Sequence, residues 1–102
     1  MEKSTDKIRL DKWLWYARFF KSRQLSTKMV LARKVRVNAI TIKKPGRSVA
    51  IGDILTFSQN DDIRVIRIKT LGIRRGPASE ARTLYYDLLT NIEKSVNKPS
   101  FE

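Results

Sequence analysis

The spacing of the apolar residues changes about a third of the way along this chain, and the change limits the folds that the chain can adopt. Before it, apolar residues recur at the spacing of one helix face, at Leu10, Trp13, Leu14 and Ala17. After it, the stretch "VRVNAITIK" alternates apolar and other residues, as half-buried strands do. The sequence therefore predicts an α+β fold in which two N-terminal helices pack on a small antiparallel sheet.

The two helices are predicted to be short and close together. Asp11 is suited to cap the first, over about residues 11–20. Ser22 is suited to cap the second, which continues to about residue 33. A connection of only a residue or two would turn the helices sharply against each other. Trp15 and Phe19 lie off the apolar face, where aromatic rings either pack against other elements or stack on nucleic-acid bases.

Three to five short strands are predicted after the helices. The first two flank Asn38-Ala39, and a type I′ turn there would place Ala39 at a positive φ at a cost of about 1 kcal/mol. Further strands are expected at about residues 54–58 and 63–71. A C-terminal amphipathic helix is expected to start near Pro77, with a continuous apolar face formed by Ala81, Leu84, Tyr85, Leu88, Leu89 and Ile92.

The length of 102 residues is enough for one modest core, so one domain is expected. Residues 1–8 are predicted to be flexible, residues 9–57 to form the N-terminal part and residues 58–93 to complete the same domain. Residues 94–102 are short and polar and are expected to fray.

Positive charge is concentrated in the first half of the chain. Residues 1–50 hold 14 basic and 3 acidic residues, whereas residues 51–102 hold 8 and 7. This asymmetry indicates a surface for nucleic acid or an anionic membrane. The first helix is interrupted too early to keep the wide apolar face of a membrane-surface helix, and no apolar run is long enough for a signal peptide or a membrane span. Nucleic acid is therefore the favoured partner, no membrane partner is expected, and a cytoplasmic location is the simplest interpretation.

Catalysis and metal binding are disfavoured because the chain contains neither histidine nor cysteine. The acids at positions 61, 62, 80 and 87 form no paired arrangement, and "KPGRS" lacks the glycine pattern of a phosphate-binding loop. We therefore expect no catalytic residue, no metal site and no cofactor.

The basic residues are distributed so that several can share one surface. Lys12 and Lys21 bracket the first helix, and the rest of the set lies in the second helix and the first strand, at Arg23, Lys28, Lys34 and Arg36. Arg36 alternates with two valines and should point away from the core. Such a set is either an interface for nucleic acid or a solvated face. Ser22 at a helix start can add hydroxyl and N–H donors to a phosphate.

Four blocks in register resemble the S4 RNA-binding domain: "RLDKWL" at 9–14, "SRQLSTKMV" at 22–30, "KVRVN" at 34–38 and "VAIGDIL" at 49–55. The longer stretch "RLDKWLWYARFFKSR" and the later "RRGPASEA" are similar to a family of stand-alone S4 proteins, the ribosome-associated heat-shock proteins. That similarity extends to about residue 89. The chain departs from the family pattern at Arg33 and Ala39, where glycine is usual, and at Ser26, where alanine is usual. Those relatives carry a longer basic C-terminal extension beyond the position of Glu102, so contacts made by such an extension are not expected from this sequence.

The resemblance implies an αL-type S4 fold whose two helices and hairpin form one RNA-binding face. Together with the charge pattern, it predicts an RNA-binding set of Arg9, Asp11, Lys12, Lys21, Ser22, Arg23, Lys28, Lys34, Arg36 and Asn38. The implied partner is ribosomal RNA of the large subunit, with transfer RNA on a stalled subunit as a second contact, in rescue or recycling after stress. A monomer is expected. A DNA-binding protein and a mainly structural ribosome-associated protein are the alternatives.

Overall fold

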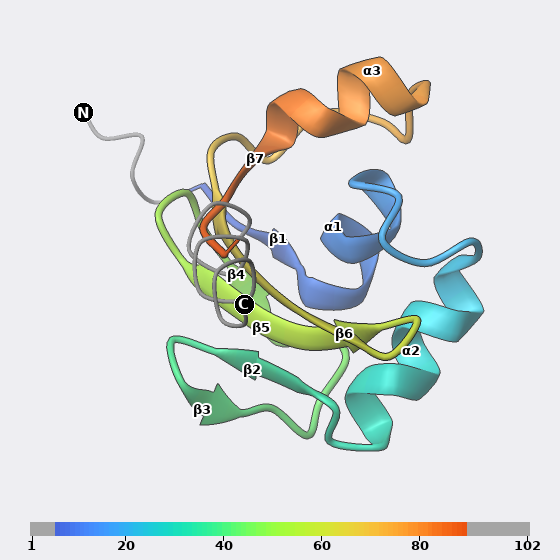
Figure 1. The fold of residues 1–102 in the computed structure, drawn as a ribbon, viewed down its shortest axis with the longest axis vertical. Coiled ribbons are helices and arrows are strands. Elements are labelled where there is room, and N and C mark those ends of the chain that lie inside the picture. The colour runs from blue at the N-terminus through green and yellow to red at the C-terminus, as the bar shows by residue number, and fades with distance from the viewer. Residues whose placement is uncertain (1–5, 90–102) are drawn as a thin grey trace, which may run out of the picture.

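The structure, a computed structural model, describes residues 6–89 and has the α+β architecture predicted from the sequence (Figure 1). Two antiparallel sheets and two N-terminal helices account for most of it. The elements in chain order are β1 (Ile8–Arg9), α1 (Leu10–Tyr16), α2 (Arg23–Leu31), β2 (Val35–Val37), β3 (Ile40–Thr41), β4 (Ser48–Val49), β5 (Ile54–Gln59), β6 (Asp62–Ile68), α3 (Ala78–Ala81), the 3-10 turn η2 (Arg82–Leu84) and β7 (Tyr85–Asp87).

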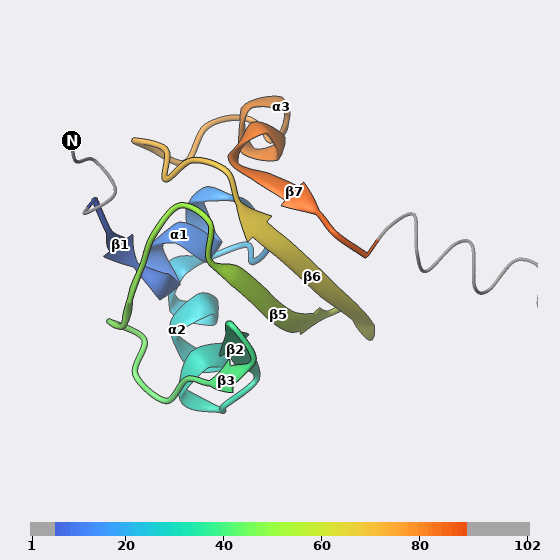
Figure 2. The ribbon, with the colours of Figure 1, turned by 90° about the vertical axis from the view of Figure 1, so that its left-hand side faces the viewer.

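The larger sheet has five strands in the order β3-β2-β5-β6-β7, all antiparallel to their neighbours. Helices α1 and α2 lie on the same side of the β5–β6 hairpin (Figure 2). The smaller sheet pairs β1 with β4 and was not expected from the sequence. It fixes the start of α1, because the Leu10 and Asp11 N–H groups donate to the carbonyls of Arg47 and Pro45.

The core lies between the two helices and the five-stranded sheet. Trp13 is fully buried, as predicted, and its indole N–H donates to the Thr70 carbonyl at 3.1 Å. The Phe19 ring lies 4.9 Å from that of Phe57 and 4.6 Å from that of Tyr85. Of the two alternatives for Phe19, packing is therefore the one observed.

The first helix is shorter than predicted, and Asp11 is not its cap. Arg9 occupies the N-cap position, and loop carbonyls rather than a side chain accept the first N–H groups of the helix. The helix ends at Tyr16 because Arg18 adopts a left-handed conformation with φ of 63°. The connection to the second helix is consequently longer than the expected residue or two, since α2 begins only at Arg23.

The second helix starts as predicted. The Ser22 hydroxyl accepts the Leu25 N–H at 3.0 Å, which satisfies one of the free donors at the helix start. The helix ends at Leu31, two residues earlier than expected, and Arg33 then adopts a left-handed conformation with φ of 62°.

The predicted C-terminal amphipathic helix is wrong over residues 85–87. Only one helical turn forms after Pro77, and the 3-10 turn η2 then leads into β7. Strand β7 pairs with β6, in the register Tyr85 to Ile68, and so covers an otherwise open sheet edge. Tyrosines favour strands, and this pairing outweighs the helical spacing of the apolar residues. Ile92, residues 1–5 and the predicted tail 94–102 lie outside the described part of the chain.

The hairpin turn has the strained backbone that its sequence predicts. Asn38 and Ala39 have φ values of 50° and 72°, as a type I′ turn requires. We expect Ala39→Gly to raise the free energy of unfolding by about 0.5–1 kcal/mol, because glycine adopts a positive φ without a clash. Urea denaturation measures the change. Ala32→Gly is the control, since Ala32 has a φ of −80° and should gain nothing from glycine. Equal effects at both positions would contradict this explanation.

Candidate nucleic-acid interface

A buried carboxylate organises the N-terminal basic residues. Asp11 is only 1% exposed, although it lies in the first turn of α1. Its carboxylate accepts two hydrogen bonds from the Arg9 guanidinium, both at 3.0 Å, and one from the Thr27 hydroxyl at 2.9 Å. An Arg23 terminal nitrogen lies 3.7 Å from the other carboxylate oxygen. We call Arg9, Asp11, Arg23 and Thr27 the Asp11 cluster; it joins the start of α1 to α2.

The pKa of Asp11 is set by opposing effects. Burial alone would raise it, but the hydrogen bonds from Arg9 and Thr27 and the charges of Arg9 and Arg23 outweigh burial, so the pKa is lowered. A lowered folded-state pKa means that the ionised group stabilises the fold above its unfolded pKa of about 4. That contribution disappears as the pH falls from about 4 through the folded-state pKa.

We expect Asp11→Asn to lower the free energy of unfolding at neutral pH by about 1–3 kcal/mol, because a buried charge-assisted network loses its anion. The variant should also lose less stability than the wild type when the pH falls below about 4. Urea denaturation at neutral and acid pH measures both effects. Asp62→Asn, at an exposed position of β6, is the control. If both variants retain the acid sensitivity of the wild type, the Asp11 cluster does not carry it.

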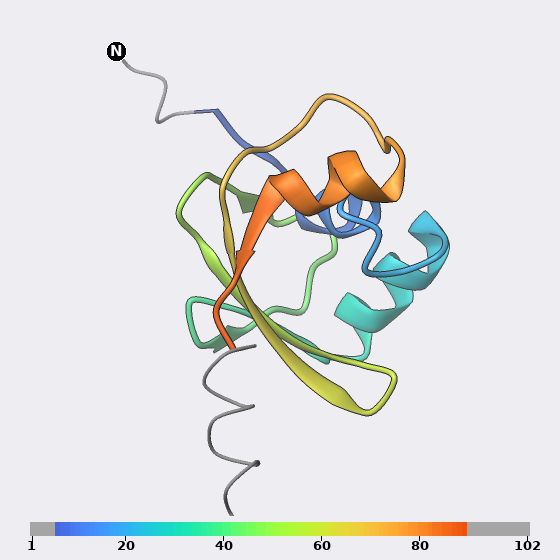
Figure 3. The ribbon, with the colours of Figure 1, turned by 45° about the horizontal axis from the view of Figure 1, so that its top comes forward.

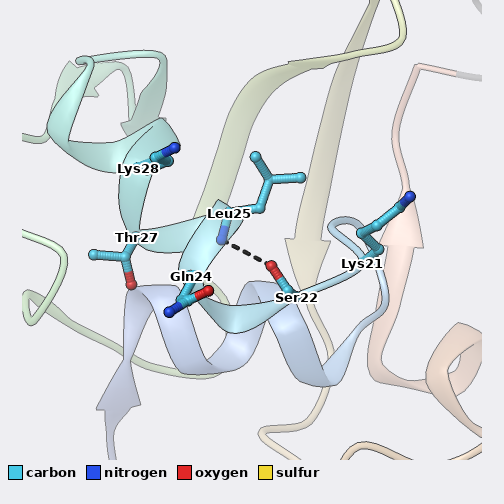
Figure 4. A pocket seen from close by; sticks show the side chains of 6 residues that line it. All are labelled: Lys21, Ser22, Gln24, Leu25, Thr27 and Lys28. Atoms are coloured by element: carbon cyan, nitrogen blue, oxygen red, sulfur yellow. Dashed lines mark hydrogen bonds between the residues drawn. The ribbon is translucent and has the colours of Figure 1, made fainter.

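A shallow pocket of about 630 Å³ adjoins the Asp11 cluster along α2 (Figure 4). The pocket is lined by Lys21, Ser22, Gln24, Leu25, Thr27 and Lys28, which we call the α2 surface. Lys21 and Lys28 are exposed and form no ion pair with a carboxylate of residues 6–89. Thr27 belongs to both groups, so the pocket and the two arginines of the Asp11 cluster form one continuous cationic surface.

Four predicted residues lie outside this surface. Lys34 is exposed between α2 and β2, and Arg36 projects from the face of the sheet opposite the core, as the alternation predicted. Lys12 lies near Tyr16, with its ammonium group 5.6 Å from the ring centroid, in a different groove. The Asn38 side chain accepts the Ile54 N–H at 2.9 Å and donates to Asp53 at 3.2 Å, so it holds the hairpin turn against β5.

Sequence reasoning missed the roles of Thr27 and Gly46. Thr27 stands four residues after Arg23, so the two side chains share one face of α2, but only the fold brings Asp11 to that face. Gly46 leaves room for the Arg9 guanidinium, because a Cβ there would stand 3.3 Å from an Arg9 terminal nitrogen. The "KPGR" stretch showed a loop but gave no sign of this contact.

The described residues contain no group of three or more side chains suited to hold a metal ion. Over residues 6–89 no helix is both long and apolar enough to cross a bilayer.

Residues 8–55 match the family model of the S4 domain. The fold and the cationic surface of its two helices thus define an RNA-binding module of the S4 type. Heat shock protein 15 of Escherichia coli K12 is 41% identical over 93 residues, which are 91% of this chain and 69% of that protein. The Aeromonas salmonicida homolog of heat shock protein 15 is 35% identical over 89% of this chain and 68% of its own length. The chain belongs to the heat shock protein 15 family.

A solved structure supports this assignment. Trimeric heat shock protein 15 from Vibrio cholerae superposes with a TM-score of 0.82 at 38% identity, over 95% of this chain and 97% of that one.

Proposed function

We propose that this chain binds ribosomal RNA in the large subunit and acts in the rescue or recycling of stalled subunits after stress. The observation that carries the proposal is the continuous cationic surface formed by the Asp11 cluster and the α2 surface within the S4 segment. Membership of the heat shock protein 15 family supports the ribosome as the site of action.

The cluster suits phosphate recognition because its arginines are held in place. Asp11 fixes Arg9 through one edge of its guanidinium and attracts Arg23. A guanidinium fixed by a carboxylate loses less conformational entropy when its free N–H groups bind a phosphate. Lys21 and Lys28 add mobile point charges beside it. Asp11 itself is buried and orients the arginines without touching RNA.

This arrangement acts by binding, without a catalytic step. If four to six phosphates are neutralised, the affinity for RNA should fall on the order of a few hundred-fold between about 50 and 200 mM salt. A salt-independent affinity would contradict a phosphate-based interface.

The first test is cosedimentation of the tagged protein with cell lysate on a sucrose gradient at moderate and high salt. We expect enrichment with free large subunits at moderate salt and its loss at high salt. Crosslinking of these fractions would then identify the RNA, including transfer RNA on a stalled subunit. Absence from every ribosomal fraction would refute the ribosomal part of the proposal and leave S4-type RNA binding to be assigned another RNA.

DNA binding is tested by competition. A short RNA duplex and a DNA duplex of the same sequence carry the same phosphate charge and differ in helix shape and in the 2′-hydroxyl. We expect the RNA duplex to displace large-subunit RNA from the protein more efficiently than the DNA duplex does. Stronger competition by DNA would favour the DNA-binding alternative.

We further propose that the protein is a monomer and that it is cytoplasmic. Light scattering after size exclusion distinguishes a monomer from a trimer like that of the Vibrio cholerae protein, and cell fractionation tests the location.

A further inference from the structure

A cationic groove lies beside the α2 surface. It is bordered by the connection from α1 to α2, by the β5–β6 turn and by the start of α3. Figures 1 and 3 show the orange segment of α3 beside the blue connection that follows α1. The groove has a volume of about 620 Å³, and its lining includes Arg18, Lys21 and Arg75 but no carboxylate. It shares Lys21 and Leu25 with the pocket of Figure 4, so it continues the α2 surface.

Backbone carbonyls hold the two arginines of the groove in place. The Arg75 guanidinium donates to the Trp15 carbonyl at 3.0 Å and to the Phe20 carbonyl at 3.4 Å, and it lies 5.4 Å from the Trp15 ring centroid. Arg18 donates through Nε to the Gly76 carbonyl at 2.6 Å. These bonds satisfy carbonyls near the end of α1 and tie it to the loop before α3. They do not explain why two cations stand together.

The charge of this pair is not balanced within the described residues. Neither Arg18 nor Arg75 forms an ion pair with a carboxylate of residues 6–89, and Glu80 is paired with Arg74. Burial, followed by the charge of Arg18, lowers the pKa of Arg75. In residues 6–89 the terminal nitrogens of Arg18 have no hydrogen-bond partner. An anion that accepted from them would offset the repulsion between the two guanidinium groups.

We propose that this groove binds one nucleotide of an RNA strand that runs on from the α2 surface. The phosphate lies among Arg18, Arg75 and Lys21, and the ribose or base lies against Leu25 and Met29, which also line the groove. The volume is in the range of sites for small organic ligands, and mixed cationic and apolar linings are typical of surfaces that hold single strands. This inference rests on the proposed function and adds a contact from the α1–α2 connection and the loop before α3.

The test is an NMR titration of the full chain labelled on arginine side chains and on leucine and methionine methyl groups. The probe is a short oligouridylate at concentrations that permit non-specific binding. We expect shifts of the Arg18 and Arg75 Nε–Hε signals and of the Leu25 and Met29 methyl signals. Shifts confined to Arg9, Arg23 and the rest of α2 would refute the groove and leave the proposed function intact. No shift anywhere would contradict both.

A polyglutamate peptide of matched charge distinguishes a nucleotide from any anion. Equal shifts from that peptide would overturn the assignment to RNA.

The affinity of the Arg18→Gln variant for oligouridylate tests the groove independently. We expect it to weaken oligouridylate binding about tenfold and to reduce the slope of log affinity against log salt by about 0.7–0.9, the loss of one phosphate contact. Arg82→Gln, an exposed position of η2 outside the groove, should leave both unchanged. Identical behaviour of the two variants would also refute the groove.

Discussion

Replacing Arg23 and Lys28 together by glutamine is expected to weaken binding to isolated large ribosomal subunits by about a hundredfold. Arg23 belongs to the Asp11 cluster and Lys28 to the α2 surface, which together form one continuous cationic surface. Each charge-assisted contact to a phosphate contributes strongly to affinity. Filter binding at fixed salt measures the effect. The fold should persist, because Arg9 and Thr27 still hold the Asp11 carboxylate.

The matched control removes the same charge elsewhere. Arg67→Gln with Arg82→Gln changes two exposed arginines, on β6 and η2, and should weaken binding only slightly. An equal loss in both double variants would mean that net charge, rather than this surface, governs binding.

The single variant Arg36→Gln tests whether the RNA also contacts the hairpin. Because Arg36 projects from the outer face of the sheet, a loss of about tenfold would show that the RNA also contacts the hairpin.

Trp13→Ala is expected to abolish cooperative folding. The side chain is completely buried, and its removal should cost about 3–5 kcal/mol, which approaches the lower end of the roughly 5–15 kcal/mol by which native proteins are stable. The Thr70 carbonyl would also lose its donor. Thermal unfolding followed by near-ultraviolet circular dichroism measures the loss.

Trp15→Ala is the comparison for this variant. Trp15 is half-buried beneath Arg75 rather than enclosed by the core, so its removal should leave a cooperative transition at a lower temperature. If the two variants unfold alike, burial in the core does not account for the importance of Trp13.

Local sequence signals predicted much of this structure. The Ser22 cap, the left-handed backbone at Asn38-Ala39 and the outward direction of Arg36 each depend on a few neighbouring residues, and each is observed. The prediction of a C-terminal helix was wrong at residues 85–87. The apolar spacing around Tyr85 fits a helix, but in the fold this segment pairs with the edge of β6 as a strand. That edge is not visible in a local pattern.

The Asp11 cluster was predictable only in part. The resemblance placed Arg9, Asp11 and Arg23 in one face, but the spacing of the first helix suggested that Asp11 was a cap. Its actual partners include Thr27, sixteen residues later, and the donors of its helix start find acceptors in the loop around Pro45. Tertiary contacts of this kind decide between a cap and a buried anchor, and no single stretch encodes them.

The attachment of α1 to distant residues has a consequence for synthesis of the protein. Trp13, Tyr16 and Arg18 donate to the carbonyls of Thr70, Ile73 and Gly76, each more than fifty residues later in the chain. A nascent chain that has emerged only as far as β5 has none of these acceptors, nor the core side chains of Ile66, Ile68 and Leu84. The residues of the cationic surface are therefore translated first, whereas the hydrogen bonds that hold α1 and the connection after it to the rest of the fold form only once residues 70–76 have been synthesised.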